Sequence, residues 1–260
     1  MSRTSGNNSE AAVRRAGEAA FPGFQLRRLA RTPSTQDVVR EAAGAGAREG
    51  FCCVAEEQTA GRGRSGRQWL APPGTALLMS LLLRRRPEVA AAVPLLAGLA
   101  VADAVAGLTG VPCRLKWPND VLAGSAKLAG ILTEVEAGGG IILGLGVNLT
   151  VPAFPPDVPG VSLDRLAGAA YGWEAFLTAL LPELGRRLGQ VEAGGIGSLR
   201  ADWTARAAGL GGPIRAQLGA STVEGTALGI DGDGALLVET GEGLVRLVAG
   251  EVHLLPRHDG

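Results

Sequence analysis

The sequence is poor in cysteine, histidine and aromatic residues, and each shortage excludes a class of protein. Its 260 residues include three cysteines, too few for a disulfide framework, so we expect a reducing, cytoplasmic setting. The two histidines lie far from any acidic cluster, which argues against a protein-held zinc site and a Ser-His-Asp triad. Aromatic residues make up 4% of the chain, so few side chains are available to stack on nucleic acid bases.

The chain also lacks a charge excess and any long uninterrupted apolar run. Twenty-five Lys plus Arg balance twenty-five Asp plus Glu, unlike a protein that draws its affinity from neutralising a phosphate backbone. Glycine, proline or charged residues interrupt every apolar stretch before it could span a membrane. Residues 1–22 carry no continuous apolar segment, and we expect them to be a disordered lead-in.

A segment rich in arginine and glycine, from Gly61 to Arg67, is the most informative feature present. We call it the Arg/Gly loop; it reads Gly-Arg-Gly-Arg-Ser-Gly-Arg and follows a β-prone run at 51–56. Glycine lets the backbone approach a ligand closely, and each guanidinium offers donors that match phosphate or carboxylate. A flexible basic loop and an RNA-binding segment are alternatives, but the neutral composition favours a small anionic ligand.

Short strands and flanking helices predict an α+β fold. We expect strands at 24–29, 51–56, 75–83, 113–117, 128–136 and 141–149, and helices at 37–47, 87–108, 162–189 and 196–208. The glycines around 138–140 predict a hairpin, and Pro94 is expected to kink or restart a helix. From residue 213 short strands and glycine turns predict a small antiparallel β-barrel. The expected domains are 23–210 and 213–260.

Further polar residues fall at strand ends. Lys116-Trp117-Pro118-Asn119-Asp120 places Asn119 and Asp120 in a turn after Pro118 stops a strand. Lys127 opens another strand, with Gly130 three residues on. Together with the Arg/Gly loop, these residues suggest a single site.

The ordered set of motifs resembles the biotin protein ligases. Along the chain stand Ser34-Thr35, Gln58, the Arg/Gly loop, Trp69, Lys-Trp-Pro-Asn-Asp, Lys-Leu-Ala-Gly-Ile-Leu and Gly-Leu-Gly-Val-Asn-Leu from Gly144. The resemblance covers about residues 24–255. It implies a mixed-sheet catalytic domain of the class II synthetase type with helices on its flanks, followed by an SH3-like barrel.

The resemblance also implies two reactions. Biotin and ATP first form biotinyl-5′-AMP with release of pyrophosphate, with Mg²⁺ bound mainly through the ATP phosphates and no protein metal site. The biotinyl group then passes to one lysine of a biotin carboxyl carrier domain of a biotin-dependent carboxylase.

The resemblance assigns the site residues by position. Catalysis is assigned to Arg62, Arg64, Lys127 and Asp120, with Asp120 near the incoming lysine amine. Biotin binding is assigned to Ser34, Thr35, Gln36, Gln58, Arg62, Gly63, Arg64, Lys127 and Gly130. Adenylate binding is assigned to Gly61, Arg62, Arg64, Arg67, Trp69, Lys116, Asn119, Lys127 and Asn148. Trp69 and Trp117 can equally be core residues.

Two departures and three rivals bear on this interpretation. Gln36 stands where many relatives have Asn, which puts its biotin contact in doubt, and about two dozen residues precede the catalytic core, fewer than a helix-turn-helix needs. We therefore expect no DNA and no membrane partner, and a monomer or homodimer. The rivals are a lipoate-type ligase or acyltransferase, a biotin-responsive DNA-binding repressor and a small RNA-binding protein.

Overall fold

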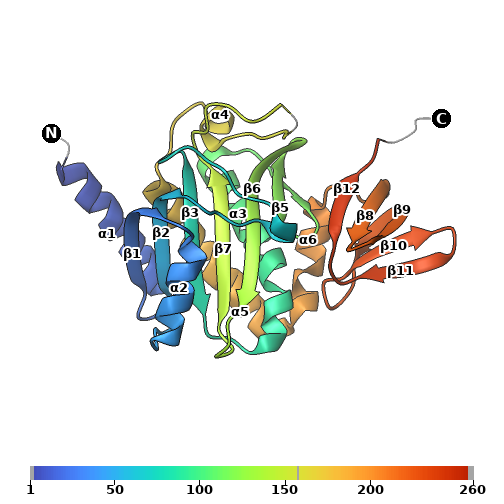
Figure 1. The fold of residues 1–260 in the computed structure, drawn as a ribbon, viewed down its shortest axis with the longest axis horizontal. Helices are drawn as coiled ribbons and strands as arrows, with labels where there is room; N and C mark the ends of the chain where they lie inside the picture. The colour runs from blue at the N-terminus through green and yellow to red at the C-terminus, as the bar shows by residue number, and fades with distance from the viewer. Residues whose placement is uncertain (1–2, 157, 257–260) are drawn as a thin grey trace.

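A seven-stranded mixed sheet forms the body of the protein. The computed structural model describes residues 3–156 and 158–256, and in it the strands lie in the order β1-β2-β3-β7-β6-β5-β4 (Figure 1). Only β1 and β2 pair in parallel; the other neighbours are antiparallel. The strands are β1 Gln25–Thr32, β2 Phe51–Gln58, β3 Ala76–Leu83, β4 Arg114–Lys116, β5 Asp120–Ala123, β6 Ala126–Val135 and β7 Ile141–Asn148.

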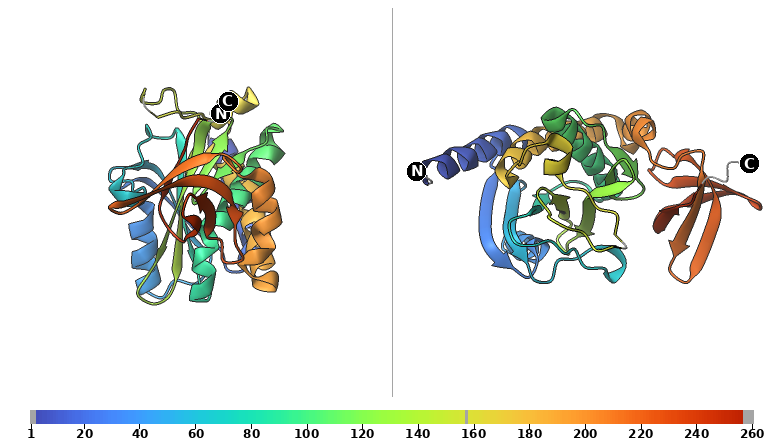
Figure 2. Two further views of the ribbon diagram at one scale, coloured as in Figure 1. Left: turned by 90° about the vertical axis from the view of Figure 1, so that its right-hand side faces the viewer. Right: turned by 90° about the horizontal axis from the view of Figure 1, so that it is seen from above.

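Helices cover the two faces of this sheet unequally. On one face lie α3 (Val93–Thr109) and α5 (Trp173–Gly194) with α1, while α2 (Thr35–Gly44) packs on β2, β3 and β7 from the other (Figure 2). Cys52 and Cys53 show the alternation, because they are adjacent and belong to separate buried clusters. Both faces of the sheet are therefore covered at the buried residues of β2 and at β3. Of the helices described, none is long and apolar enough to cross a membrane.

The N-terminal segment is the main correction to the expected fold. Instead of a disordered lead-in at 1–22, the described part forms helix α1 (Arg3–Ala20), which packs along α5. Val13 is fully buried, and Gly17 leaves room for the Phe24 ring, which lies 2.3 Å from where a Cβ would be. The apolar stripe of α1 consists mainly of small residues, which give a weak hydrophobic pattern in the sequence. The helix is stabilised mainly by its tertiary packing.

Two smaller differences concern element boundaries. The single helix expected at 162–189 is divided into α4 (Leu163–Ala167) and α5, because Gly168 adopts a left-handed conformation with φ of 66°. Asn119 lies in a turn, as expected, whereas Asp120 is the first residue of β5. Pro94 sits in the first turn of α3, which confirms the expected restart after the 3₁₀ turn η2 (Pro87–Ala91).

A separate five-stranded antiparallel sheet completes the chain at the side of the first sheet (Figure 1). Its order is β11-β10-β9-β8-β12, and η3 (Ile196–Leu199) and α6 (Arg200–Arg206) precede it. The strands are β8 Pro213–Leu218, β9 Ser221–Ile230, β10 Leu236–Thr240, β11 Gly243–Leu247 and β12 Glu251–Leu254. The buried Trp117 indole joins the two sheets by donating a hydrogen bond to the Gly234 carbonyl at 3.0 Å.

Candidate active site

A cavity of about 290 Å³ lies on the α2 face of the first sheet, beneath the Arg/Gly loop. The start of α2, strands β2, β3, β6 and β7, and the segment around 154–160 supply its other walls. It brings together most of the residues expected at the site: Ser34, Thr35, Gln36, Gln58, Arg62, Gly63, Arg64, Arg67, Trp69, Asn119, Asp120, Lys127, Gly130 and Asn148. Gly61 and Lys116 lie outside its lining.

The three arginines of the Arg/Gly loop reach three different parts of the protein. Arg62 donates two hydrogen bonds to the Asp37 carboxylate on α2, at 2.9 and 2.8 Å. Arg64 Nη1 lies 3.4 Å from Asn119 Oδ1, in the turn before β5. Arg67 pairs with Glu251 of β12, in the second sheet, at 2.8 Å. The loop is thus held by side chains more than by a strand ladder.

The backbone of the Arg/Gly loop closes on itself as a short turn. Gly63 N–H donates to the Arg67 carbonyl at 2.7 Å, and Trp69 N–H donates to the Gly61 carbonyl at 3.0 Å. Ser65 has a positive φ of 55°, a conformation that glycine adopts more readily. A Cβ at Gly61 would lie 2.6 Å from the Trp69 carbonyl, so Gly61 acts in closing the loop base and does not line the cavity.

A polar group of side chains lines one end of the cavity. The Thr35 amide and hydroxyl both donate to Gln58 Oε1, at 2.7 and 2.9 Å, and the Thr35 hydroxyl lies 2.8 Å from Ser80 Oγ. Gln36 Nε2 donates to the Leu132 carbonyl at 3.2 Å. Because Gln58 gives its carbonyl oxygen to Thr35, its amide nitrogen is the group that it can offer to a ligand.

Glycines and Trp69 form the apolar wall. A Cβ at Gly146 would lie 2.4 Å from the Trp69 ring, and one at Gly130 would lie 2.8 Å from it. The glycines on β6 and β7 therefore make the space in which the indole lies flat on the sheet. The Trp69 Nε1 atom is buried and has no hydrogen-bond partner among the described residues. Trp69 is thus part of the cavity, whereas Trp117 is a core residue between the sheets.

A carboxylate between two lysines forms the charged side of the cavity. Asp120 Oδ1 lies 2.7 Å from Lys127 Nζ, and Asp120 Oδ2 lies 3.1 Å from Lys116 Nζ. Burial acts to raise the pKa of Asp120, but the two lysines outweigh it and hold that pKa below its usual range. Lys116 reaches Asp120 from outside the cavity, while Lys127 lines it and lies 5.6 Å from the centre of the Trp69 ring.

Both asparagines expected near the adenylate brace the backbone around the cavity. Asn119 Nδ2 donates to the Ile131 carbonyl at 2.8 Å. Asn148 Nδ2 donates to the carbonyls of Lys127 and Val161, both at 3.2 Å. These bonds fix the strand ends from which Lys127 projects.

The sequence interpretation missed the acidic partners of the loop arginines. Asp37 and Glu251 hold Arg62 and Arg67, and Glu134 lies 3.7 Å from Arg62 Nε. Ser80, inside an apolar strand, was also missed, although a polar residue in such a run is a signal in itself. Nothing in the sequence pairs Glu251 with a loop 184 positions earlier (251 − 67).

Known proteins similar to this chain agree over most of its length. Residues 29–149 match the "Biotin/lipoate A/B protein ligase family". Residues 209–255 match the family "Biotin protein ligase C terminal domain". The chain is 40% identical to a Biotin--[acetyl-CoA-carboxylase] ligase of Mycobacterium tuberculosis, covering 88% of each chain. It is 39% identical to one of Paracoccus denitrificans, covering 86% of this chain and 98% of the relative.

A solved structure gives the same agreement in space. The biotin protein ligase from Aquifex aeolicus in complex with biotin and ATP matches with a TM-score of 0.79 at 29% identity. That match covers 89% of this chain and 98% of the Aquifex chain.

Proposed function

The chain belongs to the biotin protein ligase family, and from this premise we propose that it activates biotin as biotinyl-5′-AMP and transfers the biotinyl group to a carrier-protein lysine. The observation that carries the proposal is the cavity, where cationic side chains from the Arg/Gly loop and from β6 face a buried polar group on α2 and β2. Such an arrangement suits a ligand with a compact polar head and an anionic end. Biotin has both features.

The polar group at Thr35 and Gln58 suits the ureido ring of biotin. Thr35 is already hydrogen-bonded to both Gln58 and Ser80, so these side chains need little rearrangement to receive a ligand. Ser34 and Thr35 are almost fully buried, so their polar atoms are held in a part of the site that excludes most water. The Trp69 wall then packs against the apolar part of biotin.

In the first reaction, a biotin carboxylate oxygen attacks the α-phosphorus of ATP, and the bond to pyrophosphate breaks. Two anions must approach each other, so cations that stabilise the transition state accelerate the step. Lys127 and Arg62 line the cavity and can bracket the carboxylate and the α-phosphate. Arg64 and Arg67 add charge from the same loop.

Magnesium is expected to accompany ATP. Of the described residues, no three His, Cys, Asp or Glu side chains gather as a metal site, and Asp120 is already paired with two lysines. This donor set fits a Mg²⁺ ion held by phosphate oxygens and water, which neutralises phosphate charge when bound.

In the second reaction, a lysine amine of the carrier domain attacks the activated carbonyl carbon, and AMP leaves. Asp120 is the acidic residue lining the cavity, and Lys127 and Lys116 hold it ionised. A carboxylate with a lowered pKa is a weak base, so we assign Asp120 mainly to orienting the incoming ammonium or amine. The proton lost from the amine then passes to water or AMP.

The acceptor and the rival ligand follow from the same features. We propose a biotin carboxyl carrier domain as the protein substrate. The second sheet favours biotin over lipoate, because residues 209–255 match the C-terminal domain of biotin protein ligases. The balanced net charge gives no basis for proposing duplex DNA as a partner.

The test is a matched pair of adenylation assays. Purified protein is incubated with ATP, Mg²⁺ and either biotin or lipoate, and pyrophosphate release and the mass of a carrier domain are measured. We expect pyrophosphate release and a carrier mass gain with biotin alone. A gain with lipoate and none with biotin would contradict the proposal.

A further inference from the structure

The Arg62 side chain is held from outside the cavity by acidic residues that do not line it. Asp37 accepts hydrogen bonds from both terminal nitrogens of the Arg62 guanidinium, at 2.9 and 2.8 Å. Glu134 lies 3.7 Å from Arg62 Nε. Arg62 lines the cavity, whereas Asp37 and Glu134 do not. The carboxylates therefore stand behind the cation with respect to the site.

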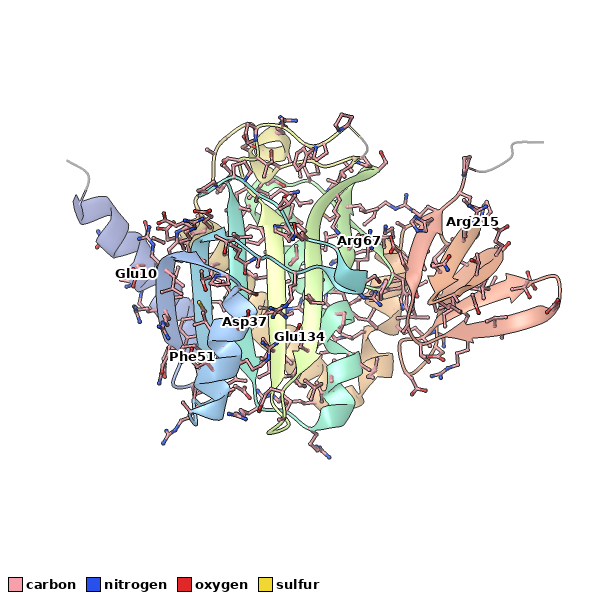
Figure 3. All side chains as sticks on the ribbon, in the orientation of Figure 1. Glu10, Asp37, Phe51, Arg67, Glu134 and Arg215 are labelled. Carbon is pink, nitrogen blue, oxygen red and sulfur yellow. The ribbon has the colours of Figure 1, made fainter. Side chains whose placement is uncertain are left out.

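A second arginine ties the two carboxylates together. Arg40 donates to Asp37 at 2.5 Å and also forms a short ion pair with Glu134. Figure 3 shows Asp37 on α2 and Glu134 on the neighbouring part of the sheet. Two acids and two arginines thus form a closed group across α2, β6 and the Arg/Gly loop. The charges in this group cancel, so Asp37 can remain ionised beside the cavity.

The geometry separates the two edges of the Arg62 guanidinium. Its end, formed by Nη1 and Nη2, is occupied by a bidentate carboxylate, which is the strong form of this contact. Its side edge, which includes Nε, has one contact among the described residues, the longer one to Glu134 at 3.7 Å. The end edge is therefore the firmly held part of the guanidinium, and the Asp37 carboxylate sets the position of Arg62.

Asp37 itself is fixed by secondary structure. It lies in the first turn of α2, where a negative charge is favoured by the helix dipole. The hydrogen bonds from Arg62 lower its pKa, so the carboxylate stays ionised throughout the neutral range. Among the described residues, Arg64 has one contact with Asn119 and Arg67 has one contact with Glu251. Asp37 is the bidentate anchor of the loop.

We propose that Asp37 is a positioning residue that holds Arg62, and through it the Arg/Gly loop, in place before biotin or ATP binds. The inference rests on the proposed biotin ligase function and goes beyond it by assigning a role to a residue outside the cavity. Without the anchor, the side chain and the loop must be ordered by the ligand, and ligand affinity falls by that cost. The chemistry of the bound state, which uses Arg62 and Lys127, changes less.

The decisive variant is Asp37→Asn, which keeps the shape of the side chain and removes its charge. We expect biotin Kd, measured by calorimetry, to rise about tenfold, as for the loss of one charged hydrogen-bonded contact. We expect single-turnover adenylation at saturating biotin and ATP to change less than about threefold. Trypsin cleavage after the loop arginines, followed by mass spectrometry without ligand, should become several-fold faster.

Two further variants separate positioning from stability. Glu41→Gln removes the same charge from an exposed position on the same helix and should leave all three measurements unchanged. Asp37→Glu keeps the charge and should restore part of the loop protection and affinity. The thermal midpoint is recorded for each variant, because a loss of stability with normal affinity and cleavage would overturn the proposal.

An increase in biotin affinity would also overturn the proposal. If Asp37→Asn tightens biotin binding, Asp37 competes with the ligand for Arg62 and does not position it for the ligand. Wild-type protein is assayed first with biotin and ATP, so a failure of the ligase function itself is recognised before any variant is compared.

Discussion

The two sides of the cavity are built in different ways. The sheet side consists of Gly130 and Gly146, which are paired in the β6–β7 ladder, and of Lys127, which pairs with Leu122 of β5. The loop side consists of the Arg/Gly loop, which side-chain contacts to Asp37, Asn119 and Glu251 hold in place. The sheet side supplies a shape and one cation held by backbone pairing, whereas the loop side supplies cations held mainly by side-chain contacts. We therefore expect changes on the sheet to block the chemistry and changes on the loop to alter how long ligands stay.

Lys127→Ala should have the largest effect, because it removes the fixed cation beside the reacting anions. We expect the single-turnover rate of adenylate formation to fall about 1000-fold, the scale of losing one electrostatic contact to a transition state. Quenched-flow measurement of pyrophosphate provides the rate. Lys116→Ala is the matched control, since Lys116 contacts the same Asp120 from outside the cavity and should cost far less. Near-normal adenylation by Lys127→Ala would remove the difference between the two sides.

Gly146→Ala tests the shape of the sheet side. The added Cβ would lie 2.4 Å from the Trp69 ring, so the indole must move into the space for biotin. Overpacking of this kind costs about 1 to 3 kcal/mol, and we expect biotin Kd to rise by about 10- to 100-fold in calorimetry. Gly107→Ala, in helix α3 with nothing within 4 Å, is the control and should bind biotin normally. Unchanged binding in Gly146→Ala would show that the Trp69 wall is not rigid.

Arg64→Gly tests the loop side. Arg64 lines the cavity, where burial lowers its pKa, and it contacts Asn119. Its loss should speed release of biotinyl-5′-AMP about tenfold, and the released adenylate should label bystander lysines. Stopped-flow dissociation and mass spectrometry of an added non-acceptor protein provide the two readouts. Arg64→Lys keeps the charge, and its release rate should lie between those of the wild-type protein and Arg64→Gly. A strongly reduced adenylation rate with normal adenylate release would show that Arg64 acts in the chemical step, as expected for Lys127, and not in retaining the adenylate.

Glu251→Gln should have the smallest effect, because its contact with Arg67 is partly exposed and such pairs contribute about 0 to 1 kcal/mol. We expect adenylate release to become faster, by less than about fivefold, because the loop is held less firmly. Glu242→Gln, in an exposed turn of the same sheet, is the control. An effect as large as that of Arg64→Gly would show that the second sheet governs loop closure.

Local sequence signals accounted for much of the first sheet and for the residues that line the cavity. Apolar runs predicted β2, β3, β6 and β7, and the glycines around 138–140 predicted the antiparallel hairpin that the structure shows. The signals failed where packing decides. Helix α1 depends on small residues that fit α5, and the division between α4 and α5 depends on one left-handed glycine.

What the sequence determined by itself is the chemical inventory of the site and its order along the chain, because residue types and spacings carry the family resemblance. The tertiary structure decided the partners. Asp37, Glu134 and Glu251 are distant from the loop arginines in sequence, and only folding brings each carboxylate to its guanidinium. It also decided that Lys116 supports Asp120 from outside the cavity while Lys127 points in. Pairing of charges depends on distance in space, and a one-dimensional pattern does not contain that distance.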